Sequence, residues 1–221
     1  IYPPDPYLVP VPDPRLVHGA STVLAADIDA KATFVPVETA PQKFPGEDGG
    51  YEGDGTVLQV GDELIWYGKR SLEAPFGFAE CRRGHLGTKV AAHRKGDRVV
   101  HLVRSYGYHM FDMDTSLLDE VAGHFGKVAN ACGIDMIYFD GSERLQGDHG
   151  YYNARLHKAF YDKLDNRNTL LQASSYSHYS WHLMARTASA DGHGDLKGYL
   201  DERSGWFDSM ARDGMPLDIG W

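Results

Sequence analysis

A carboxylate that directly follows an apolar run is the sharpest chemical signal in the sequence. Residues 134–139 are apolar except for Asp135, and Asp140 and Gly141 come next. Reactive side chains of parallel α/β folds lie at the carboxyl ends of strands. Asp140 would therefore stand at the mouth of a buried strand, with Gly141 leaving a substrate room to approach. The alternative is that Asp140 caps the next helix or begins a loop.

Further acidic, cationic and imidazole groups follow as partners for this acid. Glu143 would face the same cleft as Asp140, or else the solvent. One later loop gathers an anion, an imidazole and a cation in Asp191, His193 and Arg186. That combination suits proton transfer to an oriented substrate. Asp191 also has a structural interpretation as a helix N-cap, since aspartate is favoured there.

An aromatic segment and three single residues complete the candidates. Residues 176–182, which include Trp181, would form a platform for sugar rings or pack as a satellite core under a long loop. His149 begins a predicted helix near the Asp140 end of the sheet. Asp112 and Asp218 lie at or near the ends of two further possible strands.

The sequence lacks the motifs of metal, nucleotide and serine-hydrolase chemistry. It has no His-x-His, His-Glu-x-x-His or Cys-rich spacing, so we expect no catalytic metal. It also has no Gly-x-Gly-x-x-Gly or Walker-type loop, so we expect no nucleotide cofactor. The Gly-x-Ser-x-Gly turn that carries the nucleophile of serine hydrolases is absent too. Cys81 and Cys132 match no disulfide framework and are interpreted as buried thiols or one isolated bridge.

Composition narrows the class of partner. The net charge is −9 with 22 Lys and Arg residues, so no broad basic face for nucleic acid is expected. The 42% of apolar residues support a sizeable core. No run of about 18 apolar residues exists, so we expect no membrane span. The sequence leaves the oligomeric state open.

The elements that must position these residues fall into three predicted segments. Residues 1–20 form a proline-rich extended connector, because proline fixes φ and lacks a donor. Residues 21–104 form a β-rich inserted module of short alternating runs, with a hairpin at Gly61-Asp62. His85, His93 and the arginines of this module are interpreted as turn and packing residues.

Residues 105–221 change to strand–helix alternation. An apolar stripe predicts a helix over 116–132, which Gly133 ends. The elements expected after it are a strand (134–139), a helix (150–164), a strand (169–173), a helix (195–211) and a strand (216–220). This order is typical of a parallel sheet. Because the chain begins at Ile1 and ends at Trp221 inside a predicted strand, we expect a segment of a longer or processed protein.

The stretch Ile134 to Gly141 resembles the strand-plus-acid segment of retaining (β/α)8 glycoside hydrolases of the α-galactosidase and α-fucosidase type. The loop that carries Arg186 and Asp191 is similar to a region that supplies an acid/base or sugar contacts in such enzymes. The resemblance covers Tyr106 to Trp221, about half the chain, and differs by the β-module before it. It implies an α/β fold class, part of a (β/α)8 (TIM-type) barrel with a β-rich inserted domain.

The same resemblance implies a secreted or periplasmic glycoside hydrolase that cleaves a terminal or internal sugar of a polysaccharide or glycan. Asp140 would be the nucleophile or base, Asp191 the proton donor and Glu143 the alternate donor. The residues expected to bind the sugar are Arg186, His193 and Trp181, with His149, Asp112 and Asp218 as further contacts.

Two alternatives stay open. A polysaccharide lyase or sialidase-like enzyme would use His and Tyr side chains to abstract a proton, or Arg186 to bind a carboxylate. A non-catalytic carbohydrate-binding or structural module would use the β-rich segment as its functional part. An unsaturated product that absorbs in the ultraviolet separates elimination from hydrolysis.

Overall fold

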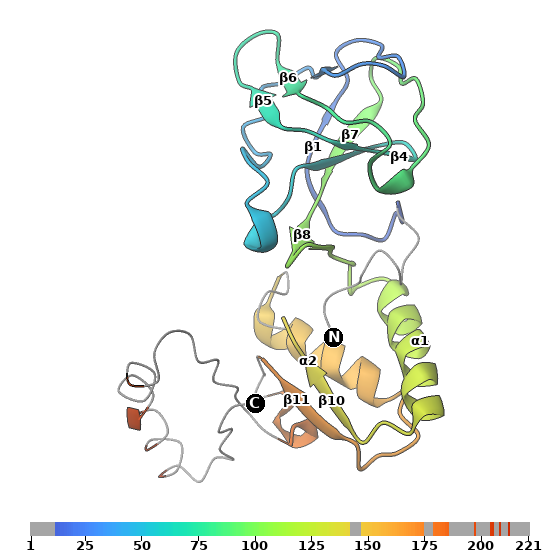
Figure 1. Cartoon of the computed structure of the whole chain (residues 1–221), viewed down its shortest axis with the longest axis vertical. Coiled ribbons are helices and arrows are strands. Elements are labelled where there is room, and N and C mark those ends of the chain that lie inside the picture. The colour runs from blue at the N-terminus through green and yellow to red at the C-terminus, as the bar shows by residue number, and fades with distance from the viewer. Residues whose placement is uncertain are drawn as a thin grey trace. The chain divides into compact units, whose positions relative to one another are not determined.

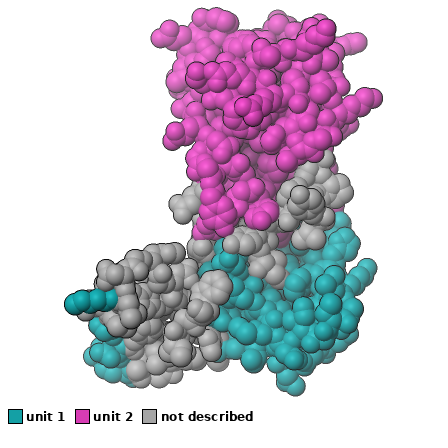
Figure 2. Space-filling view, in the orientation of Figure 1, with its two compact units in different colours: residues 1–2, 116–221 teal, residues 3–115 magenta. Residues whose placement is uncertain are grey.

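The computed structural model describes residues 12–141, 147–174, 179–185, 197, 204–205, 208 and 212 (Figure 1). The chain divides into two compact units, which Figure 2 colours separately. Unit 2 comprises residues 3–115, and unit 1 comprises residues 1–2 and 116–221. In the described residues, no helix combines the length and apolarity that crossing a membrane requires.

Unit 2 is built from small antiparallel sheets. Its largest sheet has the strand order β1-β7-β3-β4. The strands of this sheet are β1 (His18–Val23), β3 (Val57–Val60), β4 (Glu63–Trp66) and β7 (Arg98–Leu102). A second sheet has the order β2-β6-β5, from β2 (Val35–Pro36), β5 (Lys69–Ser71) and β6 (Gly77–Ala79). A third pairs β8 (Arg104–Ser105) with β9 (Tyr108–His109).

The predicted hairpin at Gly61-Asp62 is confirmed. Val60 pairs with Glu63, so a two-residue loop joins β3 to β4. Gly61 has φ +57°, a left-handed conformation that glycine adopts without a Cβ clash. The single-turn 3-10 helices η1 (Gly50–Glu52) and η2 (His85–Gly87) lie in other connections of this unit.

The core of unit 2 is aromatic and aliphatic. Tyr67 and Phe78 are fully buried, with ring centroids 4.7 Å apart, and Phe44 meets Phe78 edge-on at 4.9 Å. The Tyr67 hydroxyl donates to the Pro45 carbonyl at 2.8 Å, so its polar atom is satisfied inside the core. Side chains from both larger sheets meet here and close this unit around one core.

Unit 1 contains one parallel strand pair. Its elements are α1 (Leu117–Cys132), β10 (Met136–Phe139), α2 (His149–Tyr161), β11 (Leu170–Ala173) and the 3-10 helix η4 (Trp181–Leu183). β10 and β11 pair in parallel and lie side by side in Figure 1, with α2 as their crossover. The predicted order helix, strand, helix, strand is therefore confirmed up to residue 173. Gly133, with φ +61°, ends α1 as predicted.

The predicted fold class is wrong. A (β/α)8 barrel needs eight parallel strands closed on themselves and about eight helices. The described residues hold two α-helices and one parallel strand pair, and most of their strands belong to small antiparallel sheets. The prediction failed because a strand–helix–strand pattern determines how two strands connect but not whether their sheet continues and closes. The expected helix 195–211 lies almost wholly outside the described residues, and the expected strand 216–220 lies entirely outside them.

Candidate functional site

The carboxyl edge of the parallel pair carries Asp140 and Ser174. Phe139 pairs with Ala173, so the two residues that follow these strands are neighbours at one edge. The Ser174 N–H and Oγ–H donate to the Phe139 carbonyl at 3.0 and 3.4 Å. Asp140 is half-exposed, and its Oδ1 accepts from the Gly141 N–H at 3.1 Å. With φ +73°, Gly141 turns the chain away in a conformation that favours glycine.

A packed layer supports this edge from below. The Phe139 ring is fully buried, 4.7 Å from the His157 ring and 5.6 Å from the Phe160 ring. His157 is itself fully buried on α2, and its Nδ1 lies 3.5 Å from Ser180 Oγ. This packing holds the end of β10, and therefore the backbone of Asp140, in one position. Sequence reasoning missed His157, whose position is set by contacts with the Phe139 ring and Ser180 that arise only in the folded chain.

Three other predicted residues fall within the described range. Asp112 accepts from the Asp114 N–H at 2.9 Å, and its carbonyl accepts from the Thr115 hydroxyl at 2.6 Å, so it organises a turn in unit 2. The backbones of His149 and Trp181 begin α2 and η4, respectively. Five predicted residues lie outside the described residues: Glu143, Arg186, Asp191, His193 and Asp218.

Unit 2 also contains a buried ion cluster centred on Glu63, the first residue of β4. The Glu63 carboxylate, 1% exposed, accepts from Arg83 Nε at 2.8 Å and Arg83 Nη2 at 2.7 Å. The N–H groups of Gly84 and Ala91 donate to it at 3.0 Å each. His93 Nε2 lies 2.9 Å from Oε2 and acts as donor, because an ionised carboxylate only accepts. We call Glu63, Arg83 and His93 the buried clamp.

The clamp keeps Glu63 ionised. Burial alone would raise the pKa of its carboxyl group, but hydrogen bonds from Arg83, Ala91, His93 and Gly84 outweigh burial and lower the pKa to about 2. A carboxylate whose lone pairs are all engaged is poorly suited to accept a proton from a substrate. The arrangement therefore supports a structural role, which is to hold the loop 83–93 against β4.

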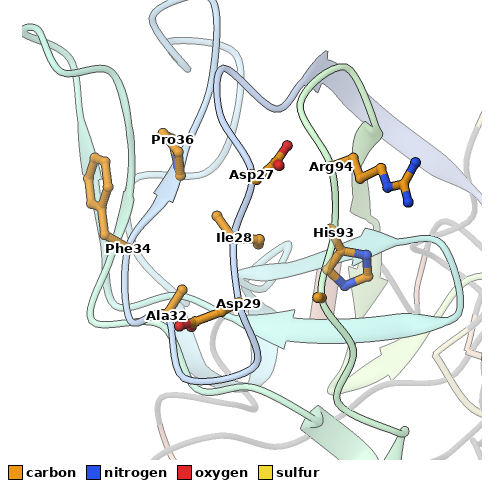
Figure 3. Close-up of a pocket in the computed structure, with 9 residues that line it drawn as sticks. Asp27, Ile28, Asp29, Ala32, Phe34, Pro36, His93 and Arg94 are labelled. Carbon is orange, nitrogen blue, oxygen red and sulfur yellow. The ribbon is translucent and has the colours of Figure 1, made fainter.

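A surface hollow of about 790 Å³ adjoins the clamp (Figure 3). Asp27, Ile28 and Asp29 lie on one limb of a loop and Phe34 on the other, while His93 comes from a separate segment. Ile28 and His93 exchange two backbone hydrogen bonds of 2.9 Å, which joins the two segments. The remaining lining residues are Ala32, Pro36, Ala92 and Arg94.

The clamp braces the walls of this hollow. Arg83 also donates to the carbonyls of Asp29 and Ala91, and His93 belongs to both features. Sequence reasoning missed the hollow because Arg83 and His93 lie 20 and 30 residues after Glu63 and form no motif with it. The only local signal was the pair of acids on either side of buried Ile28.

Metal and disulfide chemistry find no support in the described residues. No group of three or more His, Cys, Asp or Glu side chains there is arranged to hold a metal ion. Both cysteines are free thiols, so the isolated bridge considered from the sequence is wrong. Cys81 is buried as expected, but Cys132 is exposed, so the expectation of a buried thiol is wrong there. Burial raises the pKa of the Cys81 thiol to about 12, which makes it a poor nucleophile.

Comparison with known proteins adds no relative. No family model, curated protein or solved structure matches the chain. The resemblance to glycoside hydrolases therefore rests on the residues quoted for it, above all the strand that Asp140 and Gly141 follow.

Proposed function

We propose that the chain is a carbohydrate-active hydrolase in which Asp140 is one of two catalytic carboxyl groups. The observation that supports this most is the position of Asp140, half-exposed at the carboxyl end of a parallel strand pair. Ligands of α/β sheets bind outside this end of the strands. The proposal does not require a barrel, since an open parallel pair presents the same edge.

The surroundings of Asp140 favour a reacting group over a surface acid. The Phe139 ring packs against His157 and Phe160, and this packing gives the neighbouring Asp140 a rigid backbone support. Asp135 lies just before the first residue of the same strand, at its opposite end. Its side chain is exposed, and it has neither a buried aromatic residue before it nor a glycine after it.

Two carboxyl groups perform the proposed reaction. Asp191 protonates the departing oxygen while Asp140 either attacks the anomeric carbon or removes a proton from a water that does so. After direct attack, a water activated by Asp191 hydrolyses the glycosyl ester, which releases the sugar and restores the Asp140 carboxylate. Glu143 is the alternate donor. A separation of about 5–5.5 Å gives retention and about 6.5–9.5 Å gives inversion. Arg186, His193 and Trp181 are proposed to bind the sugar of a polysaccharide or glycan outside the cell or in the periplasm.

A substrate screen with matched variants tests this function. Release of reducing sugar is measured for the wild type, Asp140→Asn, Asp191→Asn, Glu143→Gln and the control Asp135→Asn. Loss of a catalytic carboxyl group is expected to slow turnover about 10²- to 10⁴-fold, whereas the control keeps the wild-type rate. Full activity of both Asp140→Asn and Asp191→Asn contradicts the proposal. An ultraviolet-absorbing product would favour a lyase instead.

The hollow beside the clamp favours a second candidate function, non-catalytic carbohydrate binding by unit 2. Its apolar floor at Ile28 and Phe34, and its rim of Asp27, Asp29 and Arg94, suit the faces and hydroxyls of a sugar. Retention on immobilised polysaccharide is then expected to weaken in Asp29→Asn and Arg94→Gln. The control Asp62→Asn makes the same charge change in the exposed hairpin loop and should have no effect.

A further inference from the structure

A second hollow, of about 490 Å³, lies in unit 1 between α2 and η4. Its volume falls in the range of small-molecule sites, about 300–1,000 Å³. Its lining includes Tyr151, Arg155, Lys158 and Tyr161 of α2 and Tyr179 from the segment before η4. Tyr179 belongs to the aromatic segment 176–182 that the sequence offered as a sugar platform.

The tyrosines give this hollow an aromatic surface. Tyr151 is 51% exposed and Tyr179 is 61% exposed, which places both among the exposed large hydrophobic side chains of the described residues. Exposed aromatic groups that gather around one hollow mark an interaction site. Each phenol ring offers an apolar face and a polar tip, the two features that a sugar ring with its C–H faces and hydroxyls matches.

The charges of the lining favour an anion. The lining includes two cations, Arg155 and Lys158, and one carboxylate, Asp162; Lys158 forms an ion pair with Asp162 one helical turn away. The Arg155 guanidinium lies 5.8 Å from the centroid of the Tyr151 ring, so a cation stands over an aromatic wall. The lining thus carries more cations than anions in a chain whose net charge is −9. Guanidinium groups bind carboxylates through two parallel hydrogen bonds.

We propose that this hollow binds a sugar residue that carries a carboxylate, a uronic acid unit of an acidic glycan. The tyrosine rings stack on the sugar ring, and Arg155 binds its carboxylate. The choice of a carbohydrate as the ligand rests on the proposed function. This site adds to that function the substrate class, which is an acidic glycan. Binding here involves no bond cleavage, so it is measured separately from turnover.

Calorimetric titration of the full chain with trigalacturonate tests the site, with the neutral trisaccharide of galactose as the matched probe. Trigalacturonate is expected to bind at least tenfold more tightly than the neutral sugar, and added salt should weaken that binding. Arg155→Gln and Tyr179→Ala are each expected to weaken it at least tenfold. Lys127→Gln removes an exposed cation from α1 and should leave it unchanged.

Three results would overturn the proposal: equal affinity for the acidic and neutral sugars, wild-type affinity in Arg155→Gln, or equal affinity for phenylacetate, which has a carboxylate but no sugar ring. Absence of trigalacturonate binding would also overturn it. Arg155 and Tyr179 are partly or well exposed, so both variants should fold, and circular dichroism checks this. If Asp140→Asn keeps its activity while titration succeeds, the hydrolase proposal fails and this site stands.

Discussion

Replacing Glu63 by glutamine tests the physical account of unit 2 in detail. The amide keeps the size of the side chain but loses the negative charge that faces the buried guanidinium of Arg83. Removing one partner of a buried ion pair costs about 3–5 kcal/mol, because the other charge is left without compensation. The lowered pKa of Glu63 leads independently to a free-energy cost of similar size. A pKa lowered from 4.5 to about 2 corresponds to about 3 kcal/mol of stabilisation of the ionised carboxylate.

Hydrogen exchange of the β3, β4 and β7 amides measures this cost in unit 2. Glu80→Gln is the matched control, because Glu80 pairs with Lys69 at the surface with side-chain exposures of 56% and 71%. An exposed pair contributes at most about 1 kcal/mol, so the control should remain near the wild type.

The pH dependence of the stability gives a second test of the Glu63→Gln variant. Because the pKa of Glu63 is lower in the folded chain, its carboxylate contributes its full stabilisation at pH values above 4.5. This contribution is lost as the pH falls from 4.5 towards about 2. The difference between the wild type and Glu63→Gln should therefore shrink over that range. A cost below about 1 kcal/mol at neutral pH, or a difference that does not shrink in acid, would refute the reasoning.

Two further predictions concern the packing of each unit. Burial, with His85, Arg104 and His101 nearby, lowers the pKa of His109 from 6.5 to about 4, so unit 2 should lose stability as the pH falls from 6.5 towards 4. His109→Gln should reduce this loss in hydrogen exchange measured across the range, while His18, His85 and His101, whose pKa values burial also lowers, keep a part of it; an unchanged slope would contradict the prediction. In α1, a Cβ at Gly126 would come within 2.5 Å of a side-chain atom and 2.8 Å of the backbone of Lys163, whereas one at Gly123 meets nothing within 4 Å. Gly126→Ala should destabilise unit 1 by about 1–3 kcal/mol, whereas Gly123→Ala should stabilise it by up to about 1 kcal/mol. Denaturant unfolding of the two variants measures both effects. Equal changes in the free energy of unfolding would contradict the packing described at Gly126.

Local patterns predicted the local elements of this chain. The apolar stripe that ends at Gly133 gave α1, and the run before Asp140 gave β10, because both signals are carried by residues close in sequence. The hairpin at Gly61 followed from its turn residues for the same reason. The extension to a closed barrel failed, since closure depends on strand pairings that no local pattern specifies.

The clamp and the two hollows were beyond the reach of such patterns. Glu63 begins a strand, where an acid is usually interpreted as solvent-facing, and only its pairing with Arg83 and His93 makes burial tolerable. The strand order β1-β7-β3-β4 brings distant segments together, so these contacts arise from the fold of unit 2 as a whole. Asp140 was predictable as a candidate because a strand end and its acid are adjacent in sequence.

Chemical rescue of Asp140→Ala tests the central claim most directly. An activated aryl glycoside that the wild type cleaves is offered to the variant with and without azide, and the products are identified by mass spectrometry. If Asp140 is the reacting carboxylate, the variant is inactive alone, and azide restores turnover by attacking the anomeric carbon to give a glycosyl azide. Wild-type turnover without azide, or an inactive variant that azide leaves inactive, would contradict the claim.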